Sequence, residues 1–194
     1  MPVGSVSHSA ATRVEPAPLD TAALTVSSDE CAVFSATIRD LMLSDSRATV
    51  VLVRERTIEG VRDAIPLTQR QLVDHLGVDR EFMSILAERW ERPGILHSCL
   101  ELGQPYKLLG EEEVGRVVGY ESVVLRKTLY YRYPGSTALV GMTRPAISDD
   151  GKKAILYFET WWGGSVVYLF HDMRDWKVLH NVKLWQQGMQ PEVP

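Results

Sequence analysis

Residues 136–186, STALVGMTRPAISDDGKKAILYFETWWGGSVVYLFHDMRDWKVLHNVKLWQ, form the stretch that decides the fold of this chain. They include half of the sixteen aromatic residues and four of the five tryptophans. Apolar and polar residues alternate along much of the stretch, as they do in half-buried strands, and turn residues interrupt the alternation. We predict an antiparallel meander of about four strands, over 139–147, 153–162, 165–171 and 176–185.

The predicted turns contain residues that favour a tight reversal of the chain. Residues 148–151 (SDDG) are typical of a hairpin turn, because Gly151 tolerates the positive φ that such turns require. The pair Gly163-Gly164 predicts a second turn, and the polar residues 172–175 predict a third. Trp176 would then begin the last strand on its apolar face, where we expect it to anchor the core.

Helical patterns precede this meander. Ser27 and Glu30 have the spacing of a capping box, and the apolar periodicity that follows predicts a helix over roughly 29–44. A β-branched run at 49–53 predicts a buried strand, and two amphipathic helices are expected within 67–92. Helices before and strands after predict an α+β fold, in which N-terminal helices pack on a C-terminal antiparallel β-meander of about four strands.

The 194 residues suit a single α+β domain over 27–188, preceded by a flexible tail over 1–26 that is rich in Ser, Ala, Thr and Pro. The formal net charge of −4 shows no basic excess, so we expect no nucleic-acid partner. No run of 18 apolar residues predicts a transmembrane segment. A native Met1 would indicate the cytoplasm, and an export signal removed upstream would indicate an extracytoplasmic location.

The two cysteines, Cys31 and Cys99, leave their pairing open. Cys31 lies on an apolar helical pattern, so we expect it to be a buried free thiol. Neither a Cys-x-x-Cys pair nor a metal-ligand spacing among the histidines occurs, and we therefore predict no metal site and no cofactor.

Four residues of the meander are candidate binding residues: Trp161, Trp162, His171 and His180. Strand alternation predicts that Trp162 points inward and that Trp161 points outward, exposed to solvent or to a partner. His171 and His180 flank the loop 172–175, and either could be a general base beside Asp172 or a hydrogen-bonded core residue.

Several segments together resemble an uncharacterised bacterial family whose members are commonly exported or lipoprotein-like. The segments that carry the resemblance are Asp29–Ser35, Arg56-Thr57, the turn Tyr133-Pro134-Gly135-Ser136, Ile147–Ala154, Gly163-Gly164 and Trp176–Val178 with Trp185. The resemblance covers about 30–56 and 130–186. It implies a capped first helix and an aromatic C-terminal meander, and it implies no particular activity.

A weaker resemblance is to NTF2-like cone folds, which also place helices against a curved antiparallel sheet and often end in a Trp-Lys-Val strand such as 175–180. That fold implies a pocket on the concave face of the sheet, which would include His180 and Trp162. We therefore expect a non-enzymatic domain that binds a protein partner or a small ligand at its aromatic sheet, and that could form homo-oligomers. The alternative is a small-molecule enzyme whose sheet-lined pocket uses His180 or His171.

Overall fold

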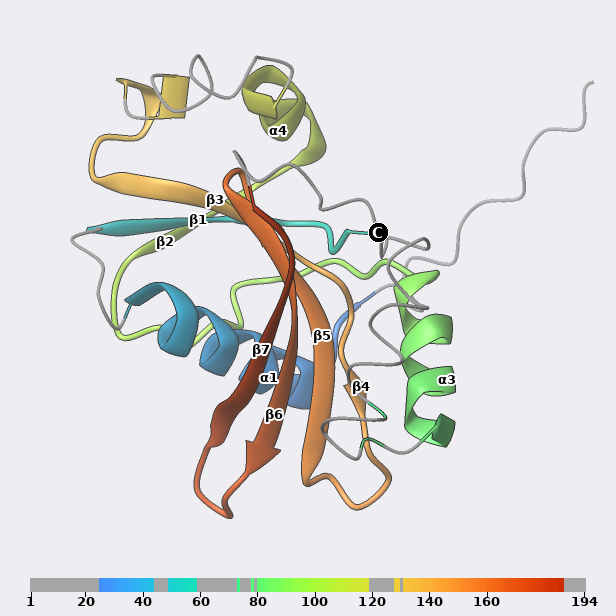
Figure 1. Ribbon diagram of the computed structural model, residues 1–194. Helices are drawn as coiled ribbons and strands as arrows, with labels where there is room; N and C mark the ends of the chain where they lie inside the picture. Colours follow the sequence, from blue (N-terminus) through green and yellow to red (C-terminus); the bar gives the residue numbers. More distant parts are fainter. Residues whose placement is uncertain are drawn as a thin grey trace, which may run out of the picture.

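A mixed seven-stranded β-sheet forms the centre of the protein in a computed structural model, and the fold is α+β (Figure 1). The structure describes residues 25–43, 49–58, 73, 78, 80–118, 128–129 and 131–186. The helices are α1 (Ser28–Ile38), which the π-helical turn η2 (Arg39–Leu43) continues, α3 (Arg80–Trp90) and α4 (Glu111–Val118). The strands are β1 (Val50–Arg54), β2 (Tyr106–Leu109), β3 (Ser136–Met142), β4 (Ala146–Ile147), β5 (Lys153–Thr160), β6 (Gly163–His171) and β7 (Trp176–Gln186).

The strand order is β2-β1-β3-β5-β6-β7, and β4 pairs with β5. Strands β3 to β7 are antiparallel to their neighbours among themselves, as predicted, but β1 is parallel to both β2 and β3. The expectation of a purely antiparallel sheet of about four strands was therefore wrong, and so was the placement of all helices before the sheet. The reason is that β1 and β2 pair with partners far along the chain, a contact that no local pattern reveals.

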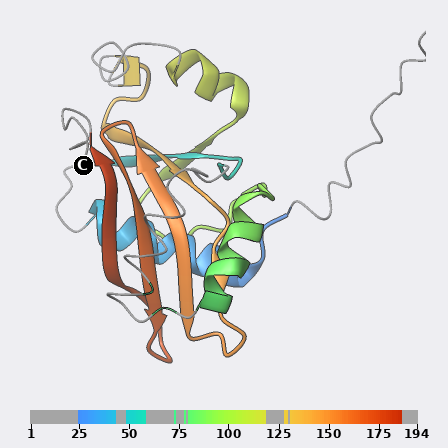
Figure 2. The ribbon, with the colours of Figure 1, turned by 45° about the vertical axis from the view of Figure 1, so that its right-hand side comes forward.

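Helices cover both faces of the sheet. Helix α1 lies across one face, while α3 and α4 lie over different halves of the other (Figures 1 and 2). Accordingly, Leu156 and Phe158 of β5 pack in the cluster under α1, and Ile155 and Tyr157 pack in the cluster under α3. The predicted alternation along this strand is confirmed, but β5 is buried on both faces rather than wet on one.

The predicted capping box starts α1. The Glu30 N–H donates to the Ser27 hydroxyl, and the Ser27 N–H donates to the Glu30 carboxylate at 2.7 Å. The same buried carboxylate accepts hydrogen bonds from Arg144 at 2.9 and 3.0 Å, and Arg89 lies 3.9 Å away. Glu30 therefore ties the start of α1 to the sheet, because Arg144 lies in the segment between β3 and β4.

Cys31 and Cys99 form a disulfide, with their Cα atoms 5.9 Å apart. The expectation of a free Cys31 thiol was wrong, because the segment after α3 runs back along α1. The Val26 N–H donates to the Ile95 carbonyl at 3.3 Å, and the Glu101 N–H donates to the Ser35 hydroxyl at 2.9 Å. These contacts bring Cys99 to the buried side of α1, so the bridge reinforces an interface that is already packed.

The predictions for the N-terminal tail and for the helical region at 67–92 fall partly outside the described residues. Residues 1–24 of the predicted tail lie outside the described residues, and so do residues 67–79 of the helical region predicted at 67–92, apart from Val73 and Val78. Within the predicted tail, Thr25 bridges to Ile95 and the side chain of Val26 is buried in the α1 cluster. Among the described residues, none of the helices has the length and apolarity needed to cross a membrane.

Candidate functional site

A groove of about 340 Å³ lies on the α1 side of the sheet, where η2 faces one end of β5, β6 and β7. We call it the Trp162 groove. It is lined by Leu41, Met42, Phe158, Thr160, Trp162, Gly163, Gly164, Ser165, Asn181, Lys183, Trp185 and Gln186. Its volume is within the range of pockets that hold small molecules.

Trp161 and Trp162 form the turn between β5 and β6, and both side chains are half-buried. Their rings meet edge to face, with centroids 5.2 Å apart. Trp161 packs against the apolar cluster of Leu52 and Leu139, whereas Trp162 lines the groove. The two side chains lie on opposite faces, as predicted, with Trp162 on the side of Phe158. The prediction that Trp161 is strongly exposed was wrong, and so was the strand assignment, because both residues form the turn.

Gly163 and Gly164 are the first residues of β6 and not the turn that we predicted. A Cβ atom on Gly164 would overlap the Tyr157 hydroxyl and the Trp185 indole nitrogen. Glycine is needed at position 164 because the Trp185 Nε1–H donates to the Tyr157 hydroxyl at 2.8 Å, and this hydrogen bond passes directly over the Gly164 backbone. Burial raises the pKa of Tyr157, so this hydroxyl stays protonated and can donate in turn.

The lining of the Trp162 groove is apolar along one wall and polar along another. Leu41, Met42, Phe158 and Trp162 supply the apolar surface, while hydroxyl and amide groups come from Thr160, Ser165, Asn181 and Gln186. Lys183 is the one charged side chain among the lining residues that the structure describes. A ligand with an apolar body and an anionic end matches this distribution.

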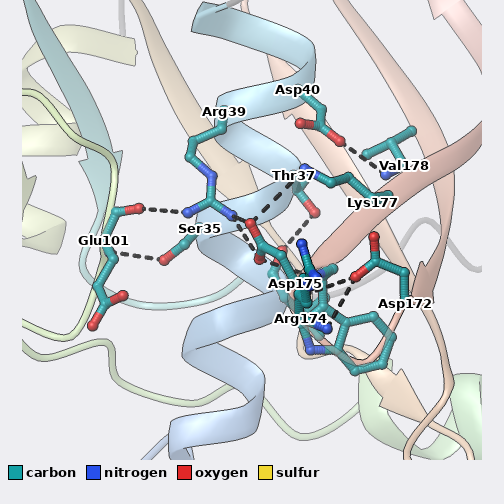
Figure 3. Close-up of polar contacts among 12 residues, drawn as sticks. Ser35, Thr37, Arg39, Asp40, Glu101, Asp172, Arg174, Asp175, Lys177 and Val178 are labelled. Atoms are coloured by element: carbon teal, nitrogen blue, oxygen red, sulfur yellow. Dashed lines mark hydrogen bonds and ion pairs between the residues drawn. The ribbon is translucent and has the colours of Figure 1, made fainter.

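A network of polar contacts holds η2 against β7, as Figure 3 shows. Both carboxylate oxygens of Asp175 accept hydrogen bonds from Arg39, at 2.7 and 2.8 Å, and a second nitrogen of the same guanidinium donates to the Glu101 carbonyl. Asp40 accepts from the Val178 N–H at 2.9 Å. These bonds fix η2, and η2 in turn places Leu41 and Met42 at the rim of the groove.

His171 lies at the end of β6, opposite Trp176, and their ring centroids are 5.1 Å apart. Trp176 is 5% exposed and packs in the cluster under α1, so the prediction of a core anchor is confirmed. Asp172 accepts hydrogen bonds from the Arg174 and Asp175 N–H groups of its own turn, and these lower its pKa. Asp172 is therefore engaged in shaping the turn.

His180 is exposed and stacks on Tyr168, with centroids 6.2 Å apart. A bulge between the pairs Tyr168–His180 and Leu169–Val178 places an extra residue, Leu179, in β7. Because each added residue reverses the faces of a strand, His180 lies on the α3 side and His171 on the α1 side. The structure therefore does not bring the two predicted histidines together, and neither lines the Trp162 groove.

Of the four predicted site residues, Trp162 is the one that lines this groove. Lys183 and η2 were not predicted as parts of a site. Leu41 and Met42 fit the apolar periodicity of the helix predicted over 29–44, and that pattern does not indicate a groove. Across the described ranges, no three His, Cys, Asp or Glu side chains converge as metal ligands would.

No protein-family model, no curated protein and no solved structure matches this chain. The two resemblances drawn from sequence motifs therefore stay expectations, and the geometry of the groove is what bears on function.

Proposed function

We propose that this protein is a non-enzymatic binding domain, and that the Trp162 groove holds a small amphipathic ligand with an anionic end. The observation that carries the proposal is the composition of the groove. An aromatic ring, Trp162, and an aliphatic wall on η2 face a polar strand surface with one cation, Lys183. Burial of the apolar body would supply most of the affinity, and the polar wall would orient the ligand.

The alternative of an enzyme with a sheet-lined pocket has less support. General acid-base chemistry needs a titratable group within hydrogen-bonding reach of the substrate. The described residues that line the Trp162 groove include neither a histidine nor a carboxylate, and His171 and His180 lie on opposite faces of the sheet.

A protein partner or a second copy of the chain is also less well supported. The exposed edge of β7 carries single exposed apolar side chains, such as Leu179, rather than a continuous patch. Two bulges and the contact from Asp40 to the Val178 N–H interrupt this edge, as in edge strands that avoid pairing.

The tryptophans make the proposal testable by NMR, with sodium octanoate as the probe. Octanoate should shift the indole resonance of Trp162 and leave those of the buried Trp90 and Trp176 in place. Octanamide, which has no charge, should bind more weakly. Equal shifts at all three indoles, or none at millimolar octanoate, would contradict the proposal.

Two lysines on the same strand give a matched pair of variants. Lys183→Gln should weaken octanoate binding by about fivefold, the scale of one solvent-exposed ion pair, and should leave octanamide binding unchanged. Lys177→Gln removes the same charge from β7 outside the groove and should have little effect on either ligand.

A further inference from the structure

A second cleft, of about 430 Å³, lies on the opposite face of the sheet from the Trp162 groove. We call it the Arg54 cleft. It is lined by Arg54, Arg56, Thr57, Ile58, Pro93, Glu111 and Glu159. Pro93 follows the end of α3 and Glu111 begins α4, so the cleft opens between these two helices, where β1 ends.

The position of the Arg54 cleft in the sheet favours a binding site. Strands β1 and β2 are parallel, and Arg54 and Glu111 lie at or just after their carboxyl ends. In open α/β sheets, ligands bind outside the carboxyl ends of parallel strands, in the crevice that the connections leave. The three parallel strands of this mixed sheet create the same local arrangement.

Two guanidinium groups line the cleft where β1 ends. Arg54 is the last residue of β1, and Arg56 follows the bend at Glu55 and bridges to Ile95. The nearest approach of Arg54 to Glu159 is 3.9 Å, which is an ion pair but too long for a hydrogen bond. Its N–H groups therefore remain available for a carboxylate, which Arg can bind through two parallel hydrogen bonds.

Two carboxylates balance these cations. Glu159 is half-buried. The Tyr157 hydroxyl helps to hold its side chain in place by donating a hydrogen bond to Oε2 at 3.2 Å. Glu111 is exposed at the rim, in the first turn of α4. Among the described residues, the lining carries two positive and two negative charges, and this balance disfavours a multiply charged anion such as phosphate.

We propose that the Arg54 cleft binds a small zwitterion of the amino-acid or dipeptide class. The Arg54 and Arg56 guanidinium groups receive the ligand carboxylate, and Glu111 receives the ammonium group. Thr57, Ile58 and Pro93 provide the short, largely apolar wall that contacts the rest of the ligand. The cleft is independent of the Trp162 groove, so either site can be tested without the other.

Isothermal titration calorimetry on the full chain tests this proposal with glycine, glycylglycine and alanylalanine as probes. N-acetylglycine lacks the ammonium group, glycinamide lacks the carboxylate, and inorganic phosphate tests for a simple anion site. At least one zwitterion should bind more tightly than all three comparison compounds. Failure of all three zwitterions to saturate the protein below about 10 mM, or tighter binding of phosphate, would overturn the proposal.

Substitutions at the exposed rim separate the two halves of the ligand. Arg56→Gln should weaken binding of the zwitterion roughly tenfold or more, the scale of one charge-assisted hydrogen bond. Glu111→Gln should weaken the zwitterion and leave N-acetylglycine unaffected. Arg174→Gln, a matched exposed arginine in the turn between β6 and β7, should change neither. Equal losses for Arg56→Gln and Arg174→Gln would refute the assignment.

Discussion

Removal of the disulfide between Cys31 and Cys99 should destabilise the protein by about 4 kcal/mol. The bridge joins residues 68 positions apart, and cross-linking a loop of that length removes about 15 cal/mol/K of entropy from the unfolded chain. At 25 °C this entropy corresponds to about 4 kcal/mol in favour of the folded state. The stabilisation is large for a domain of ordinary stability, which is about 5–15 kcal/mol in total.

Urea unfolding with and without a reducing agent measures this effect. With an m-value of about 2 kcal/mol/M, the midpoint should fall by about 2 M when the bridge is reduced. A Cys31→Ala, Cys99→Ala double variant should fall at least as far, and it should be insensitive to the reducing agent. A shift below about 0.5 M, or rapid reaction of both thiols in the untreated native protein, would refute the reasoning.

The remaining predictions concern packing and charge. Trp176→Ala should cost about 3–5 kcal/mol in urea unfolding, because it empties a buried aromatic site. Trp161→Ala should lower the free energy of unfolding by about 2 kcal/mol, because the side chain is half-buried and not exposed. A decrease below about 0.5 kcal/mol would instead support an exposed, outward orientation of Trp161. Arg144→Met should cost about 3–5 kcal/mol, because it leaves the buried Glu30 carboxylate without its main partner, and Glu30→Gln should recover part of that loss in the double variant. Since hydrogen bonds lower the pKa of Asp172 below its ordinary value of about 3.9, its contribution to stability is present above that pH and is lost as the pH falls below it. Asp172→Asn should therefore flatten the acid limb of a stability-against-pH curve, and an unchanged limb would contradict the assignment.

The Cys31–Cys99 bridge bears on the two locations that the sequence left open. Disulfides persist in exported proteins and are rare in reducing compartments. Alkylation of thiols in freshly lysed cells distinguishes the two locations, because a cytoplasmic, reduced chain would react at both cysteines and a bridged chain would react at neither.

The parts of the fold that were predictable are those with local causes. The capping box at Ser27, the hairpin at 148–151 and the alternation along β5 depend on residues that are close in sequence. The turn at 161–162 was missed because glycine normally marks a turn, whereas Gly164 is required here by the contact of Tyr157 with Trp185 across the sheet.

The candidate sites were less predictable than the fold. Each combines segments that are distant in sequence, so that no spacing reveals them: η2 meets β7 in the Trp162 groove, and β1 meets the start of α4 in the Arg54 cleft. The bulge at Leu179 was also invisible, and it alone reverses the side of the sheet to which His180 belongs. Trp162 was found because an aromatic pair beside glycines is unusual wherever it lies.

The parallel pairing of β1 also affects how the protein is made. β1 lies between β2 and β3, but β3 begins at Ser136, 86 residues after Val50. At a synthesis rate of about 5–20 residues per second, the ribosome needs roughly 4–17 s to deliver that second partner. During this interval the apolar run of β1 is a nascent strand without its final neighbours, which is the kind of segment that aggregates or recruits a chaperone. An interior strand of the sheet is thus translated early and receives its second neighbour late.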